Sequence, residues 1–186
     1  MKQFPINFSL SAGACIYGSV LLLTLPLKLL LAVCAAATIH ELGHLMMLSV
    51  FHIPIQGIHL RVGGAVIHAS PLLPFQELLC AMAGPLSSLL CLLWIRKFPL
   101  FALCALIQGL FNLLPVYPLD GGRILRSISL ICIPDRTDMI CTFAKWCTVT
   151  SLCVISVFLS YRTEELFFIL VALYFLLQGG INRKCP

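Results

Sequence analysis

The sequence predicts an all-α polytopic membrane protein with about six transmembrane helices. Two observations predict this. The chain has 186 residues, of which 60% are hydrophobic and only 10% charged, and its mean hydropathy is +1.04. A soluble domain carries about 25% charged residues, so most of this surface has to face lipid. The apolar runs are also continuous rather than alternating, which favours helices over a membrane barrel.

Six apolar segments are read as spans, because about 20 apolar residues cross a bilayer. The first begins near the N-terminus like a signal peptide but continues too far, so it is expected to be retained. The last begins with Glu164 and Glu165, and whether it crosses completely stays open. All of residues 1–186 then form one integral-membrane domain. The predicted spans are roughly 9–27, 29–51, 76–95, 98–114, 139–160 and 164–179.

The basic residues are distributed between the apolar runs, as expected for charges that orient a membrane protein. With six spans, one face collects seven of them and the other four. This bias predicts that both termini face the cytoplasm of a bacterial cell. Scattered basic residues also argue against nucleic-acid binding. The first face holds Lys2, Arg61, Arg123, Arg126, Arg136, Arg183 and Lys184, and the second holds Lys28, Arg96, Lys97 and Arg162.

Three ionisable residues lie in the middle of the second predicted span, where charge is costly. They are His40, Glu41 and His44, in the pattern His-Glu-x-x-His. At about 100° per residue the two histidines lie within about 40° of each other on a helix. Both imidazoles can then bind one zinc ion, and Glu41 can act as general base on a water. The alternative is that these residues only pair with one another or with other helices.

Asp120 is the best candidate for a third metal ligand, because a catalytic zinc site has three protein ligands and one open position. It lies in Leu119-Asp120-Gly121-Gly122, after Pro115 and Pro118, which interrupt helical hydrogen bonding. A broken helix at membrane depth is tolerated where it lines a cavity. The alternative is an ordinary turn at the end of a span.

These residues resemble the site-2 protease family of intramembrane zinc metalloproteases. The resemblance covers about 39–123 and includes His40 to His44, Ala83-Gly84-Pro85 and Asn112 to Gly122. The last element most resembles the branch of the stage IV sporulation protein FB. The resemblance implies a three-helix catalytic core at about 29–123, with accessory helices at about 9–27 and 139–179. It also implies one zinc ion held by His40, His44 and Asp120, with Glu41 as base.

The resemblance further implies that Asn112 contacts the substrate backbone, although a helix cap or an interhelical hydrogen bond would explain it equally well. One departure concerns the position three residues after Pro85, where family members often carry asparagine. Here that residue is Ser88. No additional regulatory or peptide-binding domain is expected after the core.

A short β-hairpin is predicted between the second and third spans, because Ile58 to His68 alternates around Gly63-Gly64. A two-residue turn there would place His59 opposite His68 and Arg61 opposite Val66. In similar proteases such a re-entrant hairpin approaches the active site, so Gly63 and Gly64 are candidate substrate-binding residues. The alternative is a surface loop among lipid headgroups.

The predicted activity is hydrolysis of membrane-embedded or membrane-associated proteins, on the cytoplasmic side, with precursor sigma or anti-sigma factors as one class of substrate. An inactive membrane protein that binds zinc or other proteins, and a zinc transporter, are the alternatives. The expected partners are the lipid bilayer, a membrane-protein substrate and regulatory membrane proteins. The sequence does not identify the substrate or the oligomeric state.

Overall fold

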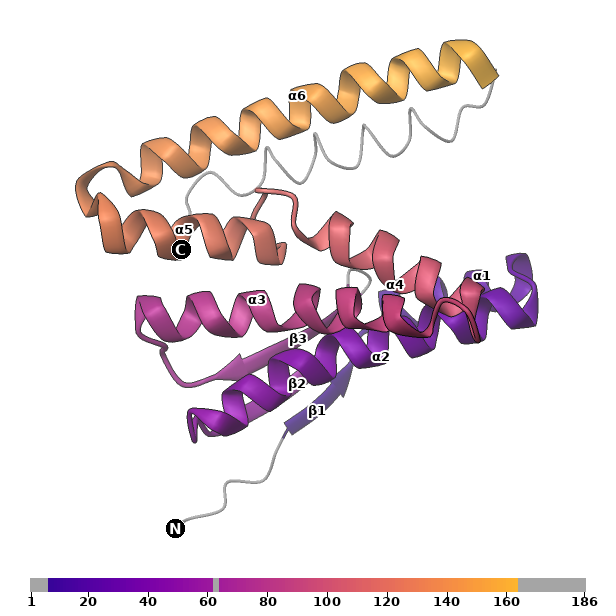
Figure 1. Cartoon of the computed structure of the whole chain (residues 1–186), viewed down its shortest axis with the longest axis horizontal. Coiled ribbons are helices and arrows are strands. Elements are labelled where there is room, and N and C mark those ends of the chain that lie inside the picture. Colours follow the sequence, from indigo (N-terminus) through magenta and orange to yellow (C-terminus); the bar gives the residue numbers. More distant parts are fainter. Residues whose placement is uncertain (1–6, 62–63, 164–186) are drawn as a thin grey trace. The chain divides into compact units, whose positions relative to one another are not determined.

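The computed structural model describes residues 7–61 and 64–163. The chain divides into two compact units, Met1–Phe111 and Asn112–Pro186. The elements are shown in Figure 1. In chain order they are β1 (Asn7–Leu10), α1 (Ala12–Thr24), α2 (Leu27–Val50), β2 (Ile55–Arg61), β3 (Gly64–Ala69), α3 (Pro74–Leu90), the 3-10 helix η1 (Cys91–Trp94), α4 (Pro99–Asn112), α5 (Asp120–Cys132), the 3-10 helix η2 (Pro134–Arg136) and α6 (Thr137–Thr163).

Three helical segments of the described chain are long and apolar enough to cross a membrane. They are Leu27–Val50, Pro74–Trp94 and Pro134–Arg162, with 24, 21 and 29 residues. Many large apolar side chains on them are exposed, including Leu42, Met46 and Phe158. An exposed apolar helix surface of this kind suits lipid, because lipid tails are as apolar as the side chains. The structure therefore supports a mostly helical membrane protein.

The prediction of six spans is not confirmed. The segment 9–27 is not one helix, because it contains part of β1 and the 13-residue helix α1. The segment 98–114 contains α4, which has 14 residues. At 1.5 Å per residue such helices measure about 20 Å, which is short of the roughly 30 Å hydrocarbon core. The sixth predicted span, 164–179, lies outside the described residues.

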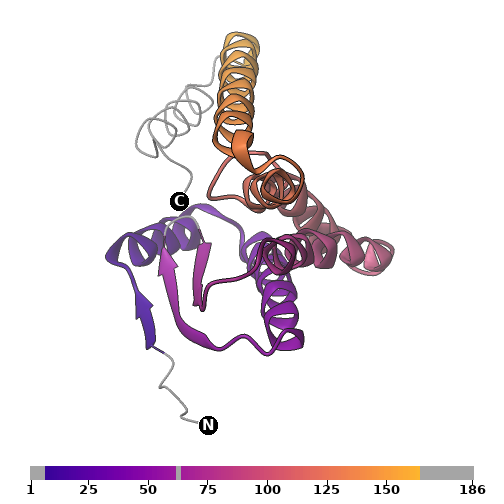
Figure 2. The same ribbon diagram turned by 90° about the vertical axis from the view of Figure 1, so that its left-hand side faces the viewer.

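A three-stranded sheet with the order β1-β2-β3 takes the place of the simple predicted hairpin (Figure 2). β2 and β3 pair antiparallel, as predicted, but the predicted register is wrong. His59 pairs with Val66, and Gly57 rather than His59 pairs with His68. Gly64 pairs with Arg61, so Gly64 belongs to β3 rather than to the predicted turn. Re-entry of this hairpin into the membrane is not confirmed.

β1 was not predicted, because its residues begin the apolar run that was read as the first span. It pairs in parallel with β2, with Ser9 opposite His59, and the Ser9 hydroxyl and His59 Nδ1 are hydrogen-bonded. One edge of β2 is therefore covered by β1 and the other by β3. Among the described strands, the edge of β3 that faces away from β2 is not paired.

Helices α2 and α3 form the densest helix pair of the first unit. Gly43 permits this approach, because a Cβ atom there would lie 2.6 Å from the Ala83 carbonyl oxygen and 2.7 Å from Ser87 Oγ. The Ser87 hydroxyl donates to the Ile39 carbonyl across the interface at 3.1 Å. At the other end of α2, Ala36 packs in a small core with Cys91 and Ala105. The first unit is thus built around a closely packed helix pair.

Candidate functional site

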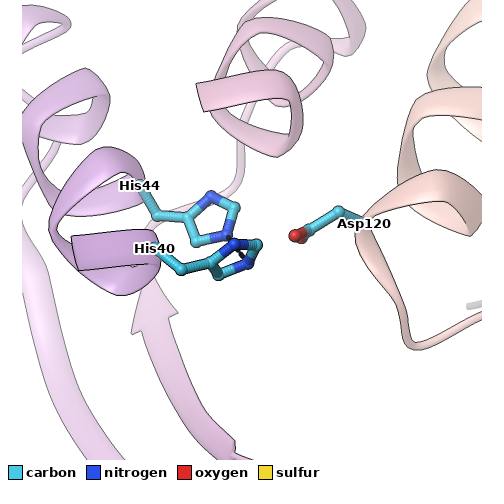
Figure 3. A group of neighbouring side chains, drawn as sticks. All are labelled: His40, His44 and Asp120. Carbon is cyan, nitrogen blue, oxygen red and sulfur yellow. Dashed lines mark hydrogen bonds between the residues drawn. The ribbon is translucent and has the colours of Figure 1, made fainter. Parts of the chain in front are cut away.

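His40 and His44 lie on the buried face of α2. Side chains at four-residue intervals point inward along this helix, because such positions lie on one side of an α-helix. The buried positions include Ala32, Ala36, His40, His44 and Leu48. The two imidazoles are 2% and 7% exposed, and their rings are nearly perpendicular with centroids 4.9 Å apart. Figure 3 shows both rings extending from consecutive turns of the same helix.

Each imidazole is held by helix α3 through its Nδ1 atom. His44 Nδ1 lies 2.8 Å from the Cys80 carbonyl oxygen, and His40 Nδ1 lies 3.0 Å from Ser88 Oγ. A carbonyl oxygen can only accept, so His44 donates a proton from Nδ1, and in the neutral ring its Nε2 is then an acceptor. Partners of this kind orient histidines that bind metals, because they fix the tautomer and the ring plane.

The two Nε2 atoms are close enough to bind a single ion, since they lie 3.3 Å apart. Two nitrogen ligands about 2.0 to 2.1 Å from a tetrahedral zinc are separated by about 3.3 to 3.4 Å. The geometry of this pair therefore fits zinc. It also fits a hydrogen bond between the rings, in which one Nε2 carries a proton.

Gly84 explains why the Ala83-Gly84-Pro85 element lies opposite the histidines. A Cβ atom at residue 84 would collide with Nε2 and Cε1 of His44 and would lie 2.9 Å from His40 Nε2. Real Cβ atoms essentially never approach other atoms so closely. A glycine is therefore required here, because the backbone of α3 packs directly against the metal-binding edges of the rings.

Asp120 is the first residue of α5, in the second unit, and its side chain is 7% exposed. The positive end of the helix dipole favours a carboxylate in this first turn. Its Oδ1 lies 3.7 Å from Arg123 Nη1, a distance typical of a loose ion pair. No other aspartate or glutamate among the described residues is buried. Burying a carboxylate is costly unless a cation accompanies it. Arg123 supplies one cation nearby, and a buried carboxylate of this kind is also of a type that can bind a metal ion.

The two glycines after Asp120 let the preceding segment fold tightly onto α5. A Cβ atom at Gly121 would lie 2.6 Å from the Leu114 carbonyl oxygen and closer still to Leu113. One at Gly122 would lie 2.5 Å from the Tyr117 nitrogen. The Asp-Gly-Gly sequence therefore has a structural cause, because no side chain fits at either glycine.

The other predicted site residues are placed as follows. Glu41 is half-buried on α2, next to His40. Asn112 is half-buried and is the last residue of α4. Gly64 begins β3, and Gly63 lies outside the described residues. The predicted roles of these residues in catalysis and substrate binding stay predictions.

Ser88 is a functional candidate whose contact with His40 the sequence reasoning missed. The sequence marked it only as a departure from the asparagine common in similar proteins, whereas its buried side chain contacts His40. A signal was present in the spacing. Cys80, Gly84 and Ser88 recur every four residues and so share one face of α3. Cys80 contacts His44, Ser88 contacts His40, and Gly84 faces both rings.

Parts of the chain are similar in sequence to known proteins. The profile of peptidase family M50 matches residues 80–152. A zinc metalloprotease of Methanocaldococcus jannaschii is 36% identical over 107 residues, which cover 50% of this chain and 32% of that protein. A relative from Synechocystis is 33% identical over 110 residues, covering 50% of this chain and 29% of the relative. The chain thus spans about a third of the length of these curated relatives.

The fold is also similar to a solved structure, described as the site-2 protease from Methanocaldococcus jannaschii. The TM-score is 0.64 at 23% identity, and the match covers 100% of this chain and 94% of the other. These findings confirm the predicted resemblance to the site-2 protease family, and they support a zinc metalloprotease. They do not specifically bear on the sporulation branch.

Proposed function

We propose that this chain, which shares the sequence profile of peptidase family M50 and the fold of a site-2 protease, hydrolyses peptide bonds of membrane-embedded or membrane-associated proteins. The observation that carries the proposal is the histidine pair. Two buried imidazoles on one apolar helix direct Nε2 atoms toward a common point, 3.3 Å apart. Such groups are costly within a bilayer unless they have a function.

Asp120 is proposed as the third zinc ligand, beside His40 and His44. All three side chains are buried, and each offers an atom of a kind that binds metal ions. Two imidazoles and a carboxylate are a donor set that catalytic zinc sites use, with one position left for water. Figure 3 draws the three side chains that this proposal unites.

The chemistry follows from the residue types. Bound zinc would activate a water molecule and polarise the scissile carbonyl group. Glu41 takes the proton of the attacking water and passes it to the leaving amine, which is the work of a general base and acid. Its position directly after His40 supports this role, because the same helix turn then carries a ligand and the base.

The metal centre is tested by removing its ligands one at a time. A chelator should abolish cleavage and added zinc should restore it. Asp120→Asn should lower zinc affinity by at least about 100-fold, because it removes a negatively charged ligand. This exceeds the usual loss when a residue that only hydrogen-bonds to a ligand is replaced. The control is Asp138→Asn, at an exposed aspartate of α6. Zinc titration of the purified variants measures both. Unchanged zinc affinity in Asp120→Asn would place the third ligand elsewhere.

The substrate is proposed to bind as a strand at the outer edge of β3, with Gly63 and Gly64 allowing close approach and Asn112 contacting its backbone. A helix hides its carbonyl groups in internal hydrogen bonds, so it has to unwind before cleavage. This proposal is supported by the sheet order, in which β3 is a terminal strand and no described strand pairs with its outer edge, whereas both edges of β2 are covered. A strand edge offers an unwound segment replacement hydrogen bonds.

Two neighbouring proline substitutions test this edge. Adjacent residues of a strand direct their N–H groups to opposite sides, so Ala65 and Val66 differ in whether theirs faces β2. Proline at the inward position disturbs the hairpin, whereas at the outward position it removes only a donor at the free edge. We expect one of the two variants to retain wild-type thermal stability and zinc affinity but to lose cleavage. Full cleavage by every stable variant would exclude pairing at this edge.

The cellular setting is proposed on chemical grounds. A multi-pass protein of the bacterial cell membrane, with its active site toward the cytoplasm, agrees with the distribution of basic residues. Precursor sigma or anti-sigma factors held at that face are the proposed class of substrate, and other membrane proteins are proposed as regulators. These proposals rest on the family resemblance and on the charge pattern.

A further inference from the structure

The two site histidines have different kinds of hydrogen-bond partner. His44 Nδ1 contacts a backbone carbonyl oxygen, that of Cys80, at 2.8 Å. His40 Nδ1 contacts the hydroxyl oxygen of Ser88 at 3.0 Å. A carbonyl group only accepts a hydrogen bond, whereas a hydroxyl group can donate or accept. His44 is therefore confined to one neutral tautomer, and His40 is not.

Two arrangements of protons satisfy the contact between His40 and Ser88. In the first, the Ser88 hydroxyl donates to Nδ1 of His40, and His40 Nε2–H can donate to Nε2 of His44, 3.3 Å away. In the second, His40 Nδ1–H donates to Ser88 Oγ, and both Nε2 atoms present lone pairs. Only the second arrangement offers two nitrogen ligands to a cation.

We propose that Ser88 is a positioning residue that lets His40 change tautomer when zinc binds. This rests on the function proposed above. The proton on Nε2 is released to solvent and Nδ1 takes up one proton from solvent, so the imidazole stays neutral with no net loss of protons. The Ser88 hydroxyl remains neutral and turns from donor to acceptor. Both arrangements keep the hydrogen bond between His40 Nδ1 and Ser88 Oγ, and losing a buried hydrogen bond of this kind would be costly.

The surroundings of Ser88 favour this dependence on its hydroxyl group. The residue is 0% exposed. Helix α4 closes over it at Gly109, where a Cβ atom would lie only 2.9 Å from the Ser88 Cβ. A water molecule needs a polar site with enough room, and this packing leaves little. The Ser88 hydroxyl is therefore the group that alanine at this position would take away from His40 Nδ1.

The first test compares three variants. Ser88→Ala should lower zinc affinity about 10-fold to 100-fold, the usual cost of removing a partner behind a metal ligand. Ser88→Thr keeps the hydroxyl group and should restore most of it. The matched control is Ser87→Ala, because Ser87 is the next residue and its hydroxyl bonds to the Ile39 and Gly84 carbonyl groups rather than to a histidine. Zinc titration and thermal unfolding are measured on each purified protein.

The second test uses wild-type protein alone, so it does not depend on any variant folding. Nitrogen-15 NMR of labelled histidine distinguishes the tautomers. His40 should carry its proton on Nε2 in the zinc-free protein and on Nδ1 in the zinc-loaded protein, while His44 stays protonated on Nδ1 in both. An unchanged His40 tautomer, or wild-type zinc affinity in Ser88→Ala, would overturn the inference.

These outcomes are separable from failure of the proposed function. If the wild-type protein bound no zinc, or bound it equally after His40→Ala and His44→Ala, the metal centre itself would be wrong. If zinc binding required both histidines but had wild-type affinity in Ser88→Ala, only the inference about Ser88 would be wrong.

Discussion

Replacing Glu41 with glutamine is expected to lower the rate of peptide hydrolysis by about 100-fold to 10,000-fold, the range that general acid–base catalysis contributes. The amide has nearly the shape of the carboxylate but cannot take a proton from water. Zinc content should stay at the wild-type level, because neither histidine nor Asp120 is changed. The rate and the zinc content are measured on the same purified protein.

The control is Glu77→Gln, which alters another half-buried glutamate, in the first turn of α3. It should cleave at close to the wild-type rate. Full activity in Glu41→Gln would remove this residue from the mechanism. The same variant can identify the substrate, since membrane fractions of cells that carry it should accumulate one protein uncut.

Replacing Gly84 with alanine is expected to have the second large effect. The new methyl group would occupy space now filled by the His44 ring, so the ring or helix α3 has to move. A displacement of about 1 Å costs a catalytic site on the order of 100-fold in rate. Zinc affinity should fall together with activity, because Nε2 of His44 is the atom displaced. Zinc titration and cleavage assays measure the two losses.

Gly18→Ala is the matched control, because nothing lies within 4 Å of a Cβ atom at that helical position. It should leave zinc binding unchanged, since alanine suits a helix better than glycine does. Normal zinc affinity in Gly84→Ala would mean that α3 can retreat from the rings, and that its close approach is not needed.

The histidine motif could be predicted from sequence because it depends on one helix alone. The spacing of His40 and His44 fixes their common face by helical geometry, and three ionisable residues in an apolar run stand out. Asp120 was predicted as a ligand for a different reason, because few carboxylates compete with it in this chain.

The errors arose where pairing between segments decides the outcome. β1 reads as the beginning of an apolar span, since four residues carry too little periodicity to separate a strand from a helix. The hairpin register was wrong by two residues, since His59 pairs with Val66 rather than His68, because the alternation of the sequence is compatible with more than one position of the turn. The contact of Ser88 with His40 depends on how α3 lies against α2, which no single segment specifies.

The contacts of α3 with both imidazoles affect how a metal ion would bind to them. Cys80 and Ser88 contact the rings from a helix that is already packed on α2 at Gly43. The side chains of His40 and His44 therefore lose their rotamer freedom during folding, before any ion is present. Binding of an ion by this pair then depends on a route for the ion between the helices, unlike in a zinc finger, where the ion organises the chain.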